Sequence, residues 1–316
     1  MSDVQDNPLE PEDTPGEAPL SRSKLPLIVG GIVALVVILV AGSFVWRAIK
    51  NKKDRKPTAA ELAAAFDNTP PPKVFSLDSI KQNLTSKQTQ LGEPIQNSVG
   101  MVLVPIPAGE FTMGTDRRDR RFTQMETQRD VKIERPFYLC AFEVTQAQFK
   151  KVYGNNPSQL IGANHPVESV TWHEANEFCR LLSELPDEKA AGRVYRLPTE
   201  WEWEFACRAG TTGAYSFGGM VRQLKEYGWF YDRGTKPQAH DVGLKLPNLW
   251  GLYDMHGNVR EWCQNTIDGE NRTGSSRVTR GGSWGDGAWG CRSAFRNVDP
   301  PDTRTFLLGF RVVLEK

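Results

Sequence analysis

The first strong pattern along the chain is an unbroken apolar run from Leu25 to Trp46, which contains no charged residue. At about 1.5 Å of rise per residue, a helix of this length crosses the ~30 Å hydrocarbon core of a bilayer. A cleaved signal peptide is the alternative, but its apolar region would be only ~7–15 residues long and would end at a small-residue cleavage motif. The run therefore predicts one transmembrane helix over residues 25–46.

The polar segments on the two sides of this run differ in charge. Residues 1–24 hold several prolines and the acidic residues Asp3, Asp6, Glu10, Glu12, Asp13 and Glu17. Such a composition buries too little apolar surface to fold, so this segment is predicted to be a disordered acidic tail. The basic residues after the run are Arg47, Lys50, Lys52, Lys53, Arg55 and Lys56, whereas only Arg22 and Lys24 precede it.

This distribution of positive charge bears on the side of the membrane that the rest of the chain occupies. Lysine and arginine are enriched on the cytoplasmic side of membrane spans, so the pattern favours a cytoplasmic globular domain. A periplasmic or extracellular domain stays open. The chain has five cysteines, an odd number, and a chain of this size does not need disulfides to hold a core, so they do not identify the compartment.

Residues 47–99 are predicted to form a basic juxtamembrane segment and a stalk. They contain a short helical pattern over 59–66, a proline-rich turn over 69–73 and a polar run over 82–96. A proline run favours extended polyproline geometry, which acts as a semi-rigid spacer. The stalk would hold a globular domain, residues 100–316, away from the bilayer.

Apolar positions within residues 100–316 predict two helices. Over residues 170–185, Thr171 can cap the helix and Glu174 stands three residues further on. Apolar residues recur at helical spacing at Ala175, Phe178, Cys179 and Leu182. Over residues 199–207, Thr199 takes the capping position, and the residues expected to face inward are Trp201, Phe205 and Ala206.

The remainder of the domain reads as short strands and long loops rich in Gly, Asn and Asp. The pattern therefore predicts an α+β fold with much irregular structure. The net charge is +1, with 39% hydrophobic and 24% charged residues, which is ordinary for a soluble globular domain with a segment added. This balance predicts no nucleic-acid partner, because it provides no strongly basic surface.

Several motifs follow one another through the domain and identify a family. They are GMVLVPIPAGEFTMGTD (100–116), PFYLCAFEVTQAQF (136–149), HPVESVTWHEANEFC (165–179) and RLPTEWEWEFACRAG (196–210), then GLYDMHGNVREW, RGGSW, CRSAFRN and LGFRVV between residues 251 and 313. Together they resemble the formylglycine-generating enzyme or sulfatase-modifying factor family. The resemblance implies the C-type-lectin-like fold, in which a small core displays long ordered loops.

The resemblance also implies a structural calcium site in the motif DMHGNVRE. Carried over position by position, the ligands are Asp254, the carbonyls of Gly257 and Val259, and Glu261. Calcium prefers six to eight oxygen ligands, which carboxylates and backbone carbonyls supply. The alternative is that Gly257 and Asn258 form only a tight turn and that Glu261 pairs with an arginine. A second calcium site of the family has no clear counterpart, because Trp229 stands where an asparagine ligand is expected.

The resemblance does not extend to the chemistry of the family's oxidase. That enzyme converts a substrate cysteine to formylglycine with O₂ and a copper ion held by two cysteine thiolates, ligands that Cu(I) selects. The matching positions here are Ala288 and Ser293, which supply no thiol, so copper is not expected. Cys291 lies nearby and is interpreted as a structural cysteine. In an oxidising compartment it would form a disulfide with Cys207.

The segment from Trp284 to Leu308 also resembles the variable region of retroelement-diversified proteins that share this fold. In those proteins, fixed framework residues alternate with positions that vary and bind ligand. The corresponding candidate contacts here are Asp286, Trp289, Phe295, Val298, Asp299, Thr303, Thr305 and Phe306. Aromatic side chains are effective anchors at such surfaces. The alternative is that these aromatic residues pack in the core.

These observations predict a membrane-tethered, non-catalytic domain that binds a protein or small ligand through its C-terminal loops. Two versions stay open, a diversified receptor and a static binding or accessory module. The competing function is a formylglycine-generating oxidase that acts on sulfatase cysteines with atypical active-site ligands.

Overall fold

The computed structural model describes residues 77–82, 84–120, 122–234, 236–267 and 275–315. The predicted acidic tail and transmembrane helix lie outside these residues, as does most of the predicted stalk. Within the described ranges, the helices are all too short or too polar to cross a bilayer. The membrane span over residues 25–46 thus stays a prediction.

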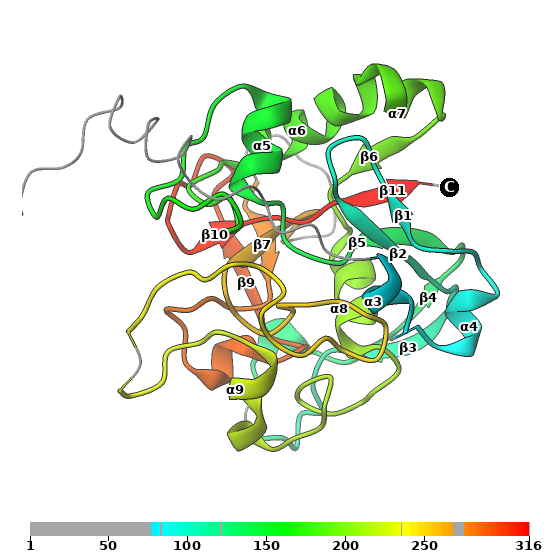
Figure 1. The fold of residues 1–316 in the computed structure, drawn as a ribbon. Helices are drawn as coiled ribbons and strands as arrows, with labels where there is room; N and C mark the ends of the chain where they lie inside the picture. The colour runs from blue at the N-terminus through cyan, green and yellow to red at the C-terminus, as the bar shows by residue number, and fades with distance from the viewer. Residues whose placement is uncertain (1–76, 83, 121, 235, 268–274, 316) are drawn as a thin grey trace, which may run out of the picture. The chain divides into compact units, whose positions relative to one another are not determined.

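The central sheet has five antiparallel strands in the order β1-β2-β5-β11-β6. Their bounds are Ile95–Gln96 (β1), Val102–Ile106 (β2), Phe137–Cys140 (β5), Val313–Glu315 (β11) and Val194–Arg196 (β6). Strand β11 pairs with β5 on one side and with β6 on the other. A strand from late in the chain therefore lies inside the sheet, as the red arrow in Figure 1 shows.

A second sheet carries the C-terminal motifs, in the order β10-β7-β8-β9. Its strands are Leu308–Gly309 (β10), Arg260–Thr266 (β7), Arg277–Arg280 (β8) and Arg296–Asp299 (β9). A two-stranded sheet pairs β3 (Gly109–Met113) with β4 (Arg129–Ile133). The strands are short and the loops between them long, as predicted for an α+β fold with much irregular structure.

Both predicted helices are present. Helix α6 spans Trp172–Glu184 and α8 spans Glu200–Arg208, and each begins with a capping box, Thr171 with Glu174 and Thr199 with Glu202. Phe205 and Ala206 are buried and Trp201 packs against the core, as predicted, but the prediction omitted Trp203. Trp203 is fully buried while Trp201 is only half-buried, because α8 is enclosed on most of its circumference and Trp203 reaches the carboxylate of Glu261.

The remaining helices are short, and the sequence pattern did not single them out. They are α3 (Leu77–Lys81), α4 (Ser86–Thr89), α5 (Gln146–Tyr153), α7 (Pro186–Ala190) and α9 (Leu224–Tyr227), with 3-10 turns η1 (Gln124–Glu126), η2 (Val221–Gln223) and η3 (Ala288–Cys291). The first two fall in the segment predicted as a stalk. There, Ile80 is buried and Gln88 donates to the carbonyls of Pro105 and Trp250, so residues 77–96 pack on the domain.

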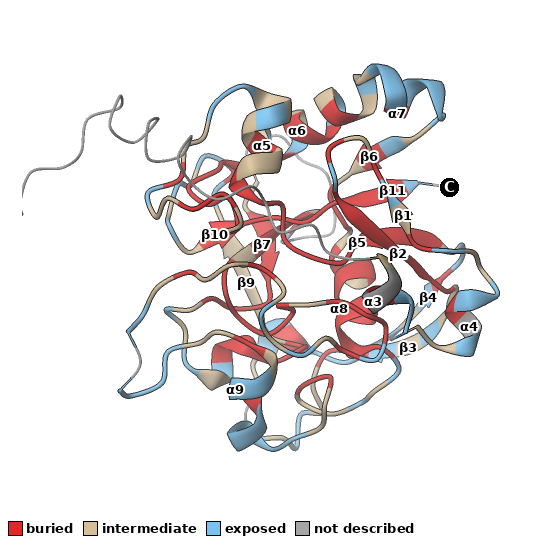
Figure 2. Ribbon diagram, viewed as in Figure 1, coloured by how far each residue is buried: buried red, intermediate tan, exposed pale blue. Residues whose placement is uncertain are grey.

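Burial is concentrated in β2, β5, β7, β8 and α8, whereas α7, much of β4 and the loop tips are exposed (Figure 2). One apolar cluster centres on α8 and the strands around it, and a second lies between α5, α6 and β11. In the long segment between residues 209 and 259, the described residues contain only η2 and α9 as helices and no strand. This segment and the C-terminal loops carry the features considered next.

Candidate functional site

The turn predicted to hold calcium is tied to the interior by one arginine. Glu261, on β7, accepts hydrogen bonds from Arg311 Nε and Nη2, each at 2.7 Å, and from Trp203 Nε1 at 2.7 Å. Arg311 also donates to the carbonyls of Cys140, Ala141 and Tyr253. Both side chains are fully buried. Both oxygens of Glu261 are therefore engaged by protein donors, which is the pairing that the alternative to the calcium site describes.

Asp254 differs from Glu261 because one of its oxygens has no partner. Its Oδ2 accepts from the backbone N–H of Gly243 at 2.7 Å, while Oδ1 is buried and makes no hydrogen bond. Its backbone is left-handed, with φ 58°, a conformation that side-chain-bearing residues adopt rarely. Burial raises the pKa of this carboxyl to about 6. A buried carboxylate oxygen without a donor fits a cation ligand.

Residues 257–259, between these carboxylates, form a turn that a third acid holds. Glu143 accepts from Asn258 Nδ2 at 2.6 Å and from the backbone N–H of Val259 at 3.0 Å. Burial raises the pKa of Glu143 well above its usual range. At Gly257, φ is 135° and an added Cβ would lie 2.1 Å from the carbonyl oxygen of Trp229, so only glycine fits. The sequence reasoning did not include Glu143, which is distant along the chain from this turn.

As a calcium site, the turn therefore fits in part. Asp254 offers an unsatisfied oxygen, and the carbonyls of Gly257 and Val259 lie in the same turn. Glu261 would have to exchange its hydrogen bonds from Arg311 and Trp203 for a metal. Among the residues that the structure describes, no group of three or more His, Cys, Asp or Glu side chains forms a ready metal cluster.

The positions that match the family's copper-binding cysteines lie in the C-terminal loops. Ala288 begins η3 and is half-buried, and Ser293 is fully buried. All five cysteines are buried and unpaired, so the cross-link between Cys207 and Cys291 is not formed. Burial raises the pKa of Cys140 to about 11 and that of Cys207 to about 12. Burial also raises the pKa values of Cys179, Cys263 and Cys291.

His256 separates the two cysteines that the sequence suggested might pair. Its Nδ1 lies 2.9 Å from the carbonyl of Cys291, and its Nε2 accepts from the backbone N–H of Ser216 at 3.1 Å and lies 3.9 Å from Cys207 Sγ. The acceptor role of Nε2 places the proton on Nδ1. Burial lowers the pKa of this imidazole to about 4. His256 is thus a neutral, fully bonded residue that ties the η3 loop to the interior.

Two of the candidate contacts in the C-terminal loops, Trp289 and Phe295, form an aromatic pair that is held in place by its neighbours. Trp289 is 46% exposed, as expected, and packs edge-on against Phe295 with ring centroids 4.5 Å apart. Arg292 lies 5.1 Å from the Trp289 ring and is itself buried, held by Glu126 through hydrogen bonds of 2.7 and 2.8 Å. The aromatic pair is therefore anchored from beneath by an ion pair that connects η3 to η1.

Two further candidate contacts are Asp286, which lies close to this pair, and Phe306, which stacks on a second ring. Asp286 and Phe295 both lie beside Gly290. A Cβ built on Gly290 would be 3.1 Å from Asp286 Cβ and 3.8 Å from the Phe295 ring, so Asp286 lies close to the pair. Phe306 is 40% exposed and stacks on Trp284 with centroids 5.5 Å apart. The sequence reasoning treated Trp284 as framework. Its half-buried ring belongs to the aromatic surface as well.

The other candidate contacts lie on different elements. Val298, on β9, packs against the first apolar cluster, and Asp299 accepts from Thr279 Oγ1 at 3.1 Å. Thr303 N donates to the carbonyl of Pro300, and the carbonyl of Thr305 accepts from Ser169 N at 3.1 Å. All four are half-buried. The structure thus brings Asp286, Trp289 and Phe295 together, and engages these four in packing or local hydrogen bonds.

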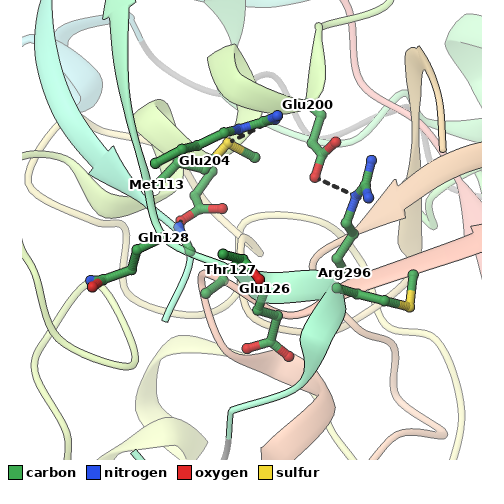
Figure 3. A pocket seen from close by; sticks show the side chains of 11 residues that line it. Met113, Glu126, Thr127, Gln128, Glu200, Glu204 and Arg296 are labelled. Carbon is green, nitrogen blue, oxygen red and sulfur yellow. Dashed lines mark hydrogen bonds and ion pairs between the residues drawn. The ribbon is translucent and has the colours of Figure 1, made fainter. Parts of the chain in front are cut away.

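A cavity of about 210 Å³ lies below Ala294, between α8, β4 and β9. Figure 3 shows Glu200 paired with Arg296 in its lining, with Glu204 and Met113 on the opposite side of the view. The charges around it are already paired, Glu200 with Arg296 at 2.7 Å and Glu204 with Arg208 at 2.7 Å and with Arg280. Because its carboxylates are neutralised by arginines, we interpret this cavity as part of the structural core and not as a binding site.

Fold and motifs together define a sulfatase-modifying-factor domain with a C-type-lectin-like architecture. Residues 87–316 match the model of the sulfatase-modifying factor enzyme 1-like domain, and the chain belongs to that family. It is 28% identical to mouse formylglycine-generating enzyme over 286 residues, covering 66% of this chain and 74% of that protein.

Two other similar proteins have names that do not describe an active enzyme. The mouse inactive C-alpha-formylglycine-generating enzyme 2 is 28% identical over 274 residues, covering 66% of this chain and 84% of that protein. Treponema denticola variable protein 1 superposes with a TM-score of 0.62 at 27% identity, covering 71% of this chain and 99% of that structure. The family thus includes proteins named as enzymes, as inactive and as variable.

Proposed function

We propose that this chain is a non-catalytic member of its family that binds a partner through the C-terminal loops. The observation that carries the proposal is the packing of the exposed Trp289 on the half-buried Phe295, held from beneath by the buried ion pair of Arg292 and Glu126. Rigid aromatic side chains contribute large contact area at small entropic cost. A protein surface patch is the expected partner.

The absence of suitable thiols supports a non-catalytic role. Cu(I) is held by thiolates, and Ala288 and Ser293 offer none. Burial keeps the five cysteines of this chain in the thiol form, with Cys207 at a pKa of about 12. The identities to an enzyme and to an inactive relative are equal at 28%, so relatedness alone does not decide activity.

The first test is enzymatic. The full chain is incubated with copper, a thiol reductant, O₂ and a peptide that contains the sulfatase cysteine motif, and aldehyde is detected by hydrazide labelling and mass spectrometry. We expect no formylglycine, whereas a formylglycine-generating enzyme run in parallel converts the peptide. Turnover that depends on copper would instead establish the competing function, an oxidase with atypical ligands.

A second test distinguishes a diversified receptor from a static binding module. The DNA around the gene is sequenced and searched for a near-copy of the segment that encodes residues 281–311, with adenines at the variable codons and a reverse transcriptase nearby. Finding it makes Trp289, Phe295 and Phe306 ligand contacts in a diversified receptor. Its absence favours a static module with fixed specificity.

Membrane tethering through residues 25–46 is part of the same proposal. Apolar length supports the span, and the basic residues after it support a cytoplasmic domain. Deletion of residues 25–46 is expected to move the protein from the membrane to the soluble fraction. Protease treatment of sealed spheroplasts and of inverted vesicles then identifies the side of the domain, and digestion in spheroplasts would contradict the cytoplasmic assignment.

We also propose that calcium binds at the turn of residues 254–261, through Asp254 and the carbonyls of Gly257 and Val259. The unpaired Oδ1 of Asp254 supports this, and Asp254→Asn is the sharper variant. Glu261→Ala would lower stability in any case, because it leaves Arg311 buried without its partner.

Calcium at 100 times its Kd is expected to add about 2.7 kcal/mol to the free energy of unfolding of the unaltered protein. Asp254→Asn should abolish this gain, while the exposed control Asp302→Asn should keep it. Equal thermal unfolding curves for the unaltered protein in calcium and in chelator would sink the calcium proposal.

A further inference from the structure

A second cavity, of about 350 Å³, opens between the segment of residues 225–245 and the C-terminal loops. Its walls are mainly apolar, and the rings of Trp229, Phe230 and Trp284 line it. This volume is at the lower end of the range for sites that enclose small molecules. The cavity is separate from the aromatic pair of Trp289 and Phe295, although Trp284 belongs to the aromatic surface of the loops.

The walls of this cavity are pre-formed by stacked rings. The Trp229 ring lies parallel to His240, with centroids 3.6 Å apart and 6° between planes. The ammonium of Lys245 lies 3.8 Å from the centre of the same indole. On the other side of the cavity, Trp284 stacks on Phe306. Such contacts fix ring orientation, so a ligand would meet a rigid surface.

Three ring nitrogens on these walls have no hydrogen-bond partner. They are Trp229 Nε1, Trp284 Nε1 and His240 Nδ1, and all three are buried. An indole N–H can only donate, and a buried donor without an acceptor costs roughly 1–3 kcal/mol. Because these nitrogens are closed off from solvent, they belong to the packed wall behind the cavity surface.

The charged residues around the cavity point to an anion. Its described lining holds three lysines, Lys225, Lys236 and Lys245, against one acid, Asp232. Lys245 is fixed by a hydrogen bond to the carbonyl of Lys225 and by its contact with Trp229. Lys236 is exposed at the rim. This cavity therefore has more positive than negative side chains in its lining. In the cavity of Figure 3, by contrast, arginines pair with the carboxylates.

We propose that this cavity is a binding site for a small organic anion that carries a planar ring. The ring lies along the wall that Phe230 and Trp284 line, and the negative charge lies toward Lys236 and Lys245. The proposal does not depend on a protein partner at Trp289. Either one can fail while the other holds.

Isothermal titration of the full chain with indole-3-acetate tests this site. The probe combines a planar ring with a carboxylate, and two analogues remove one feature each, namely indole-3-acetamide without the charge and cyclohexylacetate without the planar ring. We expect saturable binding of indole-3-acetate with a Kd below about 1 mM. Each analogue should bind at least tenfold more weakly, and inorganic phosphate alone should give no saturable heat.

Two variants connect the binding to this cavity. Lys236→Gln removes an exposed cation, and Trp284→Leu removes a wall, and each should weaken indole-3-acetate binding at least fivefold. The matched control is Lys189→Gln, an exposed lysine on α7 outside the cavity, which should bind as the unaltered chain does. Unfolding midpoints establish that each variant is folded.

Three results would overturn the site. The first is no saturable heat with indole-3-acetate, and the second is equal affinity for either analogue. The third is unaltered affinity in a folded Lys236→Gln or Trp284→Leu variant. Capture of a protein partner through Trp289 would leave all three results unaffected, so the two proposals are judged separately.

Discussion

The interior and the loop surface of this domain use the same chemical groups in opposite ways. In the interior, Arg311 and Arg292 are fully buried, and each is matched by a glutamate at about 2.7 Å. On the loop surface, Trp289 is exposed, and the indole nitrogens of Trp229 and Trp284 lack partners. The matched pairs hold the fold, while the exposed ring of Trp289 offers a surface for binding.

Asp254 departs from this pattern in the interior, as does Glu168, whose Oε2 is also buried without a hydrogen-bond partner. Asp254 lies near the saturated pair of Arg311 and Glu261, yet one carboxylate oxygen is buried without a donor. A scaffold residue with such an oxygen is costly unless a proton or a cation satisfies it. The comparison therefore assigns Asp254 to the group of residues expected to bind something.

The largest effect is expected for the buried ion pair. Arg311→Met leaves Glu261 buried with only the indole of Trp203 as a donor, and breaking such a pair costs about 3–5 kcal/mol of the free energy of unfolding. Denaturant unfolding followed by tryptophan fluorescence measures it. The double variant Arg311→Met with Glu261→Leu should recover part of the loss, because no charge is then left unpaired.

The control is an ion pair of equal length at the surface. Arg180 and Glu177 on α6 are also 2.7 Å apart, but both side chains are largely exposed. Arg180→Met should leave the unfolding midpoint close to that of the unaltered protein, because water screens such pairs. Similar losses for Arg180→Met and Arg311→Met would break the comparison between interior and surface.

The next effect concerns pH and His256. The folded pKa of His256 is about 4, below the usual value of 6.5, so the unfolded state binds more protons between these values. Stability from this residue is therefore present above pH 6.5 and is lost as the pH falls toward 4, by roughly 3 kcal/mol.

Asp254 works in the opposite direction over the same pH range. Its folded pKa of about 6 lies above the usual 3.8, so its contribution is present at low pH and is lost as the pH rises through 6. The difference between the unaltered protein and His256→Gln, measured from pH 7 to pH 4, isolates the histidine. A difference that stays constant with pH would refute the assignment of His256 as a neutral structural residue.

The smallest effect is expected at the aromatic pair. Trp289→Ala should change the free energy of unfolding by no more than about 1 kcal/mol, because the ring is 46% exposed. The matched control is Trp262, which is fully buried and donates to the carbonyl of Val170. Trp262→Ala should cost about 3–5 kcal/mol. A large loss for Trp289→Ala would make Trp289 a core residue and remove the main support for the binding surface.

Local features of the fold could be predicted from the sequence. Helices α6 and α8 follow from the capping pairs at Thr171 and Thr199 and from apolar spacing, which act within a few residues. The position of β11 between β5 and β6 could not, because strand order depends on contacts far apart in the chain. The prediction omitted Trp203 from the inward face for the same reason, since its partner Glu261 belongs to a distant strand.

In the candidate site too, features set by neighbouring residues could be predicted, whereas features set by distant residues could not. Exposure of Trp289 was predictable from its glycine and aspartate neighbours. The pairing of Glu261 with an arginine could be considered from sequence, but Arg311 could not be identified, nor could Glu143 as the acceptor for the turn. The cavity beside Trp229 is formed by three segments that come together only in the folded chain, and no short motif marks it.

The internal position of β11 has a consequence for synthesis. Strands β5 and β6 lie on either side of it and are made well before it, so neither can complete its hydrogen bonding until residues 313–315 have left the ribosome. Contacts of such long sequence separation form slowly and late. The nascent domain must therefore remain open during most of its translation, and a ribosome that stops early releases a chain whose central sheet is split.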